Sequence, residues 1–440
     1  MTHGTDHLWT VSEHLDSILG QLAPLDPIEL QLLDAQGCVL VEDVRVPVAL
    51  PPFENSSMDG YAVRVADTQA ATAEHPCVLD VIGDVAAGSG DLPTVGPGQA
   101  ARIMTGAPLP PGAEAVVPVE WTDGGTGGGP ATTMTAHSVD PAGAAGEVRV
   151  HRSPSAGQFV RSRGSDAAAG ELALPAGTVL GPPQIGLLAA IGRGTVTVRP
   201  RPRVVVLSTG SELVQPDEEL GPGRIHDSNS FALTAAARDA GAIAYRVGAV
   251  TDEVETLRAT IEDQLIRADV IVTSGGVSVG AYDVVKEALS SLGDSFGDDA
   301  VAAAGQVEFR TLAMQPGKPQ GFGRIGPDRT PLLALPGNPV SAYVSFELFV
   351  RPVIRTLMGV GPVHRDVVRA ACVVAVEHSP EGRRQYLRGH YDRTSGTVTA
   401  VGGAGSHLVK ALAYSDALIV VPEETTSVAA GEEVDVVLLG

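Results

Sequence analysis

Four apolar runs in the second half of the chain place the strongest constraint on its fold. They are RVVVLS at 203–208, AYRVGAV at 244–250, ADVIVT at 268–273 and LLAL at 332–335. Stretches with helix-like spacing of apolar residues alternate with these runs, at 230–240, 254–267 and 340–358. Because a strand that is covered on both faces is apolar along its whole length, this alternation predicts a doubly wound α/β domain built on a parallel sheet.

The segments that follow these strands are suited to binding an anion. Ligands of open parallel sheets bind beyond the carboxyl ends of the strands. Three of the four strand exits combine glycine with serine or threonine, in the segments TGSEL, SGGVSVGAYD and PGNPVSAY. Such loops offer backbone N–H groups to phosphate oxygens. The candidate binding residues of the first and third exits are Ser208, Thr209, Gly210, Ser274, Gly275, Gly276 and Ser278.

A carboxylate follows each of the first three strands: Glu212, Asp252 and Asp283. Three acids that point into one crevice repel each other unless a cation lies between them. Mg²⁺ is commonly held by a few carboxylates together with substrate phosphates, so the three acids are candidate metal ligands. Each acid taken alone could equally be a helix N-cap or a first-turn partner of the helix dipole.

Two lysines are candidate contacts for an anion. Lys318 is flanked by Pro316, Gly317 and Pro319, so its loop is stiff and little entropy is lost when it grips an anion. Lys286 could contact a phosphate but is better explained as a solvated lysine in a first helical turn. The chain has no GxxxxGK[ST] motif and no strand-linked GxGxxG, which argues against a P-loop NTPase and a dinucleotide-binding protein.

The rest of the chain predicts three further domains. Apolar spacing in residues 7–33 predicts two helices separated by Pro24 and Pro27, and residues 39–48 predict a strand. Short β-like runs predict an inserted β domain, and antiparallel runs near the C-terminus predict a small barrel or sandwich. The expected domains are 1–52 with 153–198 (elongated, α/β), 53–152 (inserted β), 199–360 (parallel sheet) and 361–440 (β barrel). The glycine-rich segment 123–130 is expected to be a solvated hairpin loop.

Charge and cysteine content narrow the function classes. The net charge of −22, from 52 acidic and 30 basic residues, disfavours nucleic acid and anionic membranes as partners. An anionic small molecule is compatible with it, because local cations and backbone N–H groups can reverse the field inside a cleft. The three cysteines are far apart in the sequence and form no CxxC pair. With no signal pattern and no apolar run near the ~20 residues of a spanning helix, a cytoplasmic protein is expected.

Long motifs distributed along the chain resemble the molybdopterin molybdenumtransferase (MoeA) family, which includes the C-terminal domain of gephyrin. The motifs, in order, are PPFENSSMDGYAVR from Pro51, RIMTGAPLPPGAEAVVPVE from Arg102, RSRGSD from Arg161, STGSEL from Ser208, DSNS from Asp227, SGGVSVGAYDVVK from Ser274, MQPGKPQGFG from Met314, LPGNPVSAY from Leu335 and GSH from Gly405. The resemblance implies a four-domain, elongated homodimer. It also implies an enzyme that hydrolyses adenylylated molybdopterin, releases AMP and places molybdate on the dithiolene to give molybdenum cofactor.

The same resemblance implies roles for individual residues. The residues it implies for catalysis are Asp59, Thr105, Asp166, Glu212, Asp252 and Asp283, the last three near Mg²⁺ and the pterin phosphate. Those it implies for the molybdate pocket are Lys318, Ser341, Arg388 and Ser406. A lysine, an arginine and two hydroxyls suit a tetrahedral dianion, because they replace its hydration with charge-assisted hydrogen bonds. The chain departs from the family at Gln315, where many members have a lysine.

The sequence alone leaves several alternatives open. Asp59 could be a turn residue before Gly60, and Thr105 could be a loop hydroxyl that bonds its own backbone. A molybdopterin adenylyltransferase is the enzymatic alternative, and a non-catalytic scaffold of the same fold is the structural one. The expected partners are a second copy of the chain and, beyond it, a molybdopterin adenylyltransferase and molybdoenzyme apoproteins.

Overall fold

The computed structural model describes residues 8–134, 146–276, 287–288 and 307–440, and the candidate residues Ser278, Asp283 and Lys286 lie outside them. The chain divides into two compact units. The first contains Met1–Val41, Gly177–Gly181 and Thr195–Gly440, and the second contains Glu42–Ala176 and Pro182–Gly194. Each unit is described by itself. The finer domain boundaries expected from the sequence remain predictions.

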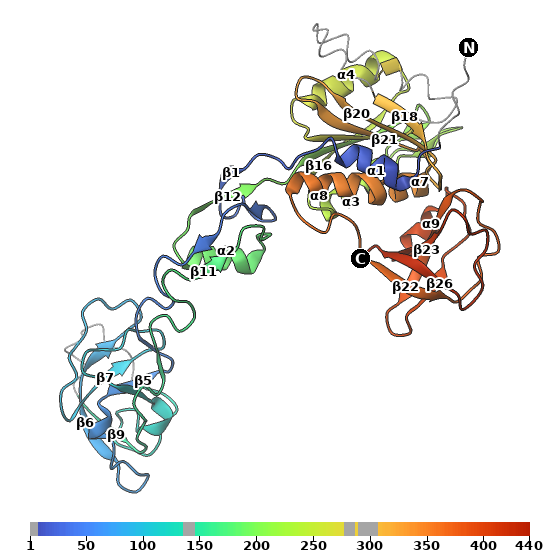
Figure 1. The fold of residues 1–440 in the computed structure, drawn as a ribbon. Helices are drawn as coiled ribbons and strands as arrows, with labels where there is room; N and C mark the ends of the chain where they lie inside the picture. The colour runs from blue at the N-terminus through green and yellow to red at the C-terminus, as the bar shows by residue number, and fades with distance from the viewer. Residues whose placement is uncertain (1–7, 135–145, 277–286, 289–306) are drawn as a thin grey trace, which may run out of the picture. The chain divides into compact units, whose positions relative to one another are not determined.

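A six-stranded sheet forms the centre of the first unit (Figure 1). Its strands, in spatial order, are β16 (Ile243–Val250), β13 (Arg203–Thr209), β17 (Val270–Ser274), β21 (Thr330–Leu335), β20 (Pro319–Ile325) and β18 (Val307–Thr311). The first four are parallel and are the four apolar runs of the sequence, which confirms the predicted parallel core. The prediction missed β20 and β18, which extend the sheet in antiparallel pairing.

Helices cover both faces of this sheet, as the doubly wound fold requires. Figure 1 shows α4 on one side of the strands and α3 and α8 on the other. Leu257 and Ile261 of α4 are fully buried against one face. Burial of a side chain of this size stabilises the fold by about 1.5–3 kcal/mol. The helices on the two faces are α4 (Val254–Leu265) on one, and α3 (Asn229–Asp239), α7 (Pro339–Ser345) and α8 (Arg351–Met358) on the other.

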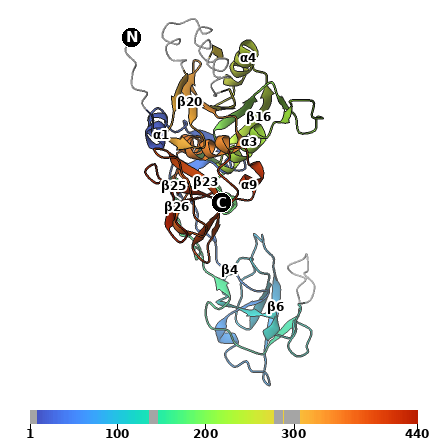
Figure 2. The same cartoon turned by 90° about the vertical axis from the view of Figure 1, so that its right-hand side faces the viewer.

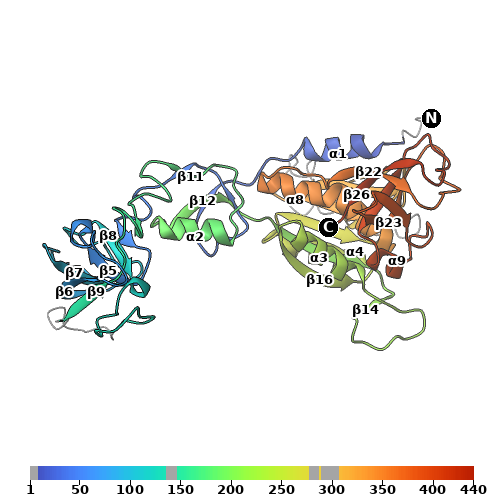
Figure 3. The ribbon, with the colours of Figure 1, turned by 90° about the horizontal axis from the view of Figure 1, so that it is seen from below.

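The N-terminal helix α1 (Val11–Leu19) belongs to the same core. Thr10 caps it, since its hydroxyl accepts a hydrogen bond from the Glu13 backbone while the Glu13 carboxylate accepts one from the Thr10 backbone. One apolar stripe, Val11, Leu15 and Ile18, is buried in the core beneath the sheet. Figure 3 shows α1 beside α8, with which it is in contact.

The second helix predicted within residues 7–33 is wrong. Residues Ile28–Gln31 form strand β1, which pairs antiparallel with β12 (Thr195–Arg199). Pro24 and Pro27 lie between α1 and β1, and neither proline can occupy a helix interior without removing a hydrogen bond. The predicted strand 39–48 is instead two short strands, β2 (Val39–Leu40) and β3 (Val44–Arg45).

Five strands near the C-terminus close into a barrel (Figure 2). They are β22 (Val367–Cys372), β23 (Arg384–Asp392), β24 (Thr397–Ala400), β25 (Ala417–Val421) and β26 (Glu433–Leu438). Pairing of β23 with β25 closes the ring. Of the two alternatives that the sequence allowed, the barrel is therefore observed. The short strand β19 (Met314–Gln315), which follows β18 in the chain, pairs with β23 and joins the barrel to the sheet domain.

The second unit contains the inserted β domain predicted from the sequence. Its five-stranded sheet has the order β8 (Ala115–Pro118), β5 (Gly60–Val63), β7 (Gln99–Ile103), β6 (Cys77–Val85) and β9 (Glu147–Val150). The unit also contains the strand pairs β4 (Asn55–Ser56) with β10 (Val160–Arg161) and β3 with β11 (Leu172–Leu174), and helix α2 (Pro182–Ala190). In the glycine-rich loop Gly125–Pro130 is exposed, as expected, while the buried Asp123 carboxylate accepts from Gly125 and Gly127 N–H.

The described part of the chain contains no helix that is long and apolar enough to cross a membrane. Its cysteines, Cys38, Cys77 and Cys372, are free thiols, and burial raises the pKa of Cys38 and Cys372. Because burial disfavours the thiolate form, these two cysteines are suited to packing and not to nucleophilic chemistry.

Candidate active site

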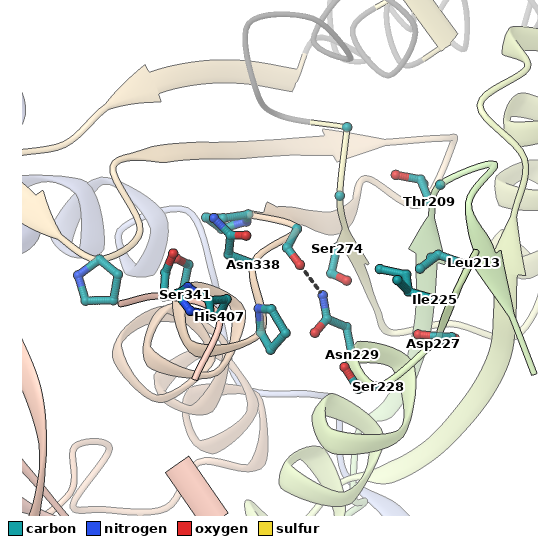
Figure 4. Close-up of a pocket in the computed structure, with 18 of the residues that line it drawn as sticks. Thr209, Leu213, Ile225, Asp227, Ser228, Asn229, Ser274, Asn338, Ser341 and His407 are labelled. Atoms are coloured by element: carbon teal, nitrogen blue, oxygen red, sulfur yellow. Dashed lines mark hydrogen bonds between the residues drawn. The ribbon is translucent and has the colours of Figure 1, made fainter. Parts of the chain in front are cut away.

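A cavity of about 730 Å³ opens at the carboxyl ends of the parallel strands in the first unit (Figure 4). Its walls come from the exits of β13, β16, β17 and β21, from the start of α7, from the loop before β20 and from the barrel loop before α9 (Val409–Ala413). This is the edge at which an open parallel sheet binds its ligands. Ten candidate residues line the cavity: Thr209, Gly210, Glu212, Asp252, Ser274, Gly275, Gly276, Lys318, Ser341 and, from the barrel, Ser406.

A buried carboxylate anchors the floor of the cavity. Asp227 is 1% exposed and accepts hydrogen bonds from the Ser208 hydroxyl (2.8 Å) and the Ser230 backbone N–H (3.0 Å). The Ser230 hydroxyl also donates to it, and the guanidinium of Arg246 lies 3.9 Å away. Sequence reasoning did not assign a role to Asp227, although it lies in the DSNS motif. Ser208 therefore supports the floor through Asp227 instead of lining the cavity.

The loop after β17 must begin with glycine. Gly275 has φ +101°, and a Cβ at this position would lie 2.3 Å from the carbonyl oxygen of Thr209. The Gly275 N–H donates to the Leu335 carbonyl (3.1 Å) at the end of the neighbouring strand. A side chain here would therefore clash with one strand exit and disturb the contact with the other. The close approach of three strand exits explains one glycine of the SGG motif.

Two of the three candidate metal ligands, Glu212 and Asp252, line this cavity. Asp252 and Ser211 are joined reciprocally, because the Ser211 N–H donates to the Asp252 carboxylate (3.1 Å) and the Asp252 N–H donates to the Ser211 hydroxyl (3.3 Å). The Glu212 carboxylate has no hydrogen-bond or ion-pair partner among the described residues and lies against Gly210, where an added Cβ would be 2.7 Å from it. Two carboxylates that line one cavity fit Mg²⁺, which prefers oxygen ligands.

Three candidate molybdate contacts lie around the other end of the cavity. Lys318 is exposed and belongs to the loop before β20, Ser341 is buried in the first turns of α7, and Ser406 comes from the barrel. The Ser406 carbonyl accepts a hydrogen bond from the Val340 N–H (3.0 Å), which fixes the barrel loop at the start of α7. Gln315 also lines the cavity.

Arg388, the fourth candidate molybdate contact, does not line the cavity. It is 2% exposed in β23, and its guanidinium donates to the carbonyls of Gly405 (3.2 Å) and Gly403. Burial lowers the pKa of the guanidinium. In this structure Arg388 therefore holds the loop that leads into Ser406. The sequence identified Arg388 as a cation, but it could not show that the guanidinium donates to backbone carbonyls and does not point into the cavity.

The remaining candidate residues, Asp59, Thr105 and Asp166, lie in the second unit. The Asp59 carboxylate accepts hydrogen bonds from both the N–H (2.6 Å) and the hydroxyl (2.8 Å) of Thr105. The Thr105 hydroxyl thus donates to a side chain 46 residues earlier in the sequence, which contradicts the alternative that it only bonds its own backbone. Asp166 is exposed, and its N–H donates to the Leu50 carbonyl (2.9 Å).

Several polar residues of the cavity were not singled out from the sequence. Asn229, at the start of α3, donates from its side chain to the Gly337 carbonyl (2.7 Å), the dashed contact in Figure 4. This bond joins α3 to the loop before α7. His226, Ser228, Asn338 and His407 also line the cavity. Asn229 belongs to the DSNS motif and Asn338 to the PGNP segment, so these two motifs could have identified both residues as candidates.

Three protein-family models match successive segments of the chain. The MoeA N-terminal region (domain I and II) matches residues 9–192, a probable molybdopterin binding domain matches 205–356, and the MoeA C-terminal region (domain IV) matches 375–439. The chain is 44% identical to molybdopterin molybdenumtransferase 2 of Mycobacterium tuberculosis, over 97% of this chain and 98% of that protein. The chain belongs to the MoeA family of molybdopterin molybdenumtransferases.

Other members of the MoeA family agree in sequence and in fold. Molybdopterin molybdenumtransferase 1 of Mycobacterium tuberculosis is 40% identical, over 94% of this chain and 95% of that protein. The crystal structure of a molybdopterin biosynthesis MoeA protein from Pyrococcus horikoshii is similar with a TM-score of 0.72 and 31% identity, covering 99% of this chain and 100% of that chain. The family consists of transferases in molybdenum cofactor biosynthesis, and the match over the full length favours this activity over adenylyl transfer.

Proposed function

We propose that this member of the MoeA family binds adenylylated molybdopterin and molybdate in the cavity at the strand exits. There it releases AMP with the help of Mg²⁺ and yields molybdenum cofactor. The observation that carries the proposal is the cavity itself. It brings glycine-rich strand exits, two carboxylates, a lysine and two serines to one place from segments up to about 200 residues apart in the chain.

The pterin phosphate is assigned to the exits of β13 and β17. Gly275 and Gly276 have φ values of +101° and +68°, and with Thr209 and Ser274 they line one wall of the cavity. Glycine in this conformation lets the backbone approach an anion without a side chain in the way. Asp227, at the floor of the cavity, accepts a hydrogen bond from Ser208 at the end of β13 and so supports this wall. This hydrogen bond holds the wall in place without a bound substrate, so the wall is preorganised.

Glu212 and Asp252 would hold the metal ion. A bound Mg²⁺ would draw charge from the pyrophosphate link and so favour attack by water and departure of AMP. The protein's part is to present the two carboxylates. Asp252 is kept in place by Ser211, and Glu212 is free of other described partners, so its oxygens are available as ligands. The third acid, Asp283, lies outside the described residues and stays a prediction.

Molybdate is assigned to Lys318, Ser341 and Ser406. Molybdate is a tetrahedral dianion, and one ammonium with two hydroxyls can donate charge-assisted hydrogen bonds to its oxygens. The three side chains come from different elements, so their spacing depends on how firmly those elements are joined. Arg388 acts in this scheme by holding the Gly403–Gly405 backbone that leads to Ser406. With Gln315 in place of lysine, the pocket has one cation fewer than in many relatives.

The homodimer, the contributions of Asp59, Thr105 and Asp166 to catalysis, and a cytoplasmic location form part of the same proposal. The family resemblance supports the first two, and the free cysteines are compatible with a reducing compartment. A molybdopterin adenylyltransferase and molybdoenzyme apoproteins are the proposed protein partners. The acidic net charge of −22 argues against nucleic acid and membrane surfaces as partners.

The test is a reconstitution with purified protein, adenylylated molybdopterin, Mg²⁺ and molybdate. AMP release is measured together with activation of a cofactor-free molybdoenzyme, and Glu212→Gln is the control. Both signals, lost in the control, would support the proposal. A folded protein that gives neither signal would point to the scaffold alternative, and ATP-dependent adenylylation of molybdopterin would point to the adenylyltransferase alternative.

A further inference from the structure

A buried glutamine lies directly behind the Lys318 loop. Gln320 is the second residue of β20 and is only 1% exposed. Its side-chain NH₂ group donates two hydrogen bonds, one to the Gly317 carbonyl (2.7 Å) and one to the Ser345 hydroxyl (2.6 Å). Ser345 is the last residue of α7 and is fully buried. One amide therefore bridges the Lys318 loop and the helix that carries Ser341.

The loop and the helix approach each other closely at this bridge. Gly317 has φ +97°, and a Cβ added to it would lie 2.9 Å from the Ser345 hydroxyl oxygen and 3.0 Å from the Met314 methyl carbon. A side chain at residue 317 would therefore force the loop away from α7. Glycine permits the close approach, and the Gln320 amide uses it to satisfy two polar groups that are shielded from water.

The Lys318 backbone is held on both sides. The carbonyl that precedes it, that of Gly317, accepts from Gln320. The carbonyl of Lys318 itself accepts from the Leu312 N–H (2.8 Å). With the peptide groups on either side fixed, only the lysine side chain remains free to move. Its ammonium can therefore reach the cavity from a constant starting point.

We propose that Gln320 is a positioning residue for molybdate, which sets the spacing between Lys318 and Ser341. This inference rests on the proposed function, because it assumes that these two residues contact the oxyanion. Gln320 itself lies behind the cavity wall and does not line it. It acts on the loop through the Gly317 carbonyl and on α7 through Ser345, one helical turn after Ser341.

The inference predicts a selective kinetic defect. In Gln320→Leu the Gly317 carbonyl and the Ser345 hydroxyl lose their shared donor, and a buried polar group without a partner is unfavourable. The loop is then expected to shift towards water, and Lys318 with it. The half-saturating molybdate concentration should rise by about fivefold or more, while the maximal rate and the half-saturating concentration of adenylylated molybdopterin stay within about twofold.

The matched control is Ile325→Val in the same strand. Ile325 is fully buried in the core on the α4 face of the sheet, so this substitution removes one methylene from the packing. It should lower the unfolding temperature without changing the molybdate dependence. A shift in half-saturating molybdate that appears in Gln320→Leu and is absent from Ile325→Val supports positioning. Equal shifts in both variants would show general loss of stability and overturn the inference.

A milder variant covers the case in which Gln320→Leu does not fold. Ser345→Ala removes the acceptor on α7 and leaves Gln320 bonded to Gly317, so a rise of about twofold to fivefold in half-saturating molybdate is expected. In that case, a folded Ser345→Ala with wild-type molybdate dependence would overturn the inference. If the wild-type protein itself shows no molybdate-dependent transfer, the proposed function fails. If the wild type transfers molybdenum and both variants match it, only the role of Gln320 fails.

Discussion

The Asp59 carboxylate accepts both the backbone N–H and the hydroxyl of Thr105, at 2.6 and 2.8 Å. Both residues are exposed, so the pair contributes little to the hydrophobic core. Its contribution is to fix the loop after β7, where Thr105 lies, against the turn before β5. A negative charge held on an exposed loop by two donors is an arrangement suited to a ligand or a metal-bound substrate.

Asp59→Asn tests whether the negative charge of Asp59 matters apart from the hydrogen bonds that hold the Thr105 loop. The asparagine side-chain oxygen can accept the same two hydrogen bonds, so the loop should stay in place. If the charge serves catalysis, AMP release should fall by about tenfold or more while the unfolding temperature stays within a degree or two. Thr105→Val is the complementary variant, which removes one hydrogen bond worth about 1 kcal/mol and keeps the charge. Wild-type AMP release by Asp59→Asn would remove the charge from the mechanism.

Asp252→Asn tests the metal assignment at the β16 exit. Asparagine can still accept from the Ser211 N–H, so the local fold should persist, but it is a poor ligand for Mg²⁺. The half-saturating Mg²⁺ concentration for AMP release should rise by about tenfold or more, and excess Mg²⁺ should restore part of the rate. Asp269→Asn, which alters an ion pair with Arg203 at the opposite end of the strands, is the control. A Mg²⁺ dependence unchanged in Asp252→Asn would exclude Asp252 as a ligand.

The parts of the fold that sequence reasoning predicted are those coded locally. RVVVLS and ADVIVT contain the uninterrupted apolar runs 204–207 and 270–272, and both are central parallel strands. Their exits carry glycine next to serine or threonine, and these loops line the cavity. In each case the signal lies within about ten consecutive residues, so the physical cause and the pattern coincide.

The parts that sequence reasoning missed depend on partners far along the chain. Residues 28–31 form a strand because β12 offers an edge more than 160 residues later. The antiparallel strand β20 contains Pro319, Gly321 and Gly323, so its residues alone do not indicate a buried strand. Arg388 could be recognised as a cation, but its bonds to Gly403 and Gly405 are set by the closure of the barrel. No local pattern encodes such choices.

His14 makes the folding stability depend on pH. It is 1% exposed, its ring meets that of Phe349 edge to face at 5.0 Å, and burial and then the Arg310 charge lower its pKa from 6.5 to about 4. The unfolded chain therefore binds more protons than the folded one between these values. Stability from this histidine is present above pH 6.5 and is lost as the pH falls towards 4, by about 3 kcal/mol at most.

His14→Leu isolates this effect. The variant keeps an apolar group of similar size and removes the titration, so its unfolding should depend less on pH between 4 and 6.5 than that of the wild type. The free energy of unfolding of both proteins is measured in urea at pH 7 and pH 4.5. The carboxylates titrate in both proteins, so their contribution cancels when the two pH dependences are compared. Parallel pH dependences in the two proteins would show that His14 is not buried as a neutral ring.

Two glycine-to-alanine substitutions are expected to act in opposite directions. Gly275 has φ +101°, and a Cβ there would lie 2.3 Å from the Thr209 carbonyl oxygen, so Gly275→Ala must move a strand exit of the cavity. AMP release should fall by about tenfold or more, because this strand exit forms part of the wall assigned to the pterin phosphate. The clash cannot be relieved by a side-chain rotation, because the atom in the way is a backbone carbonyl oxygen.

Gly186 provides the contrasting case. It lies inside helix α2, and a Cβ added to it meets no atom within 4 Å. Alanine loses less conformational entropy than glycine on entering a helix, so Gly186→Ala should stabilise the protein by about 0.5–1 kcal/mol and leave AMP release unchanged. Unfolding temperature and AMP release measured on both variants complete the comparison. If Gly275→Ala kept full activity, the close approach of the β13 and β17 exits would not be needed for binding the substrate.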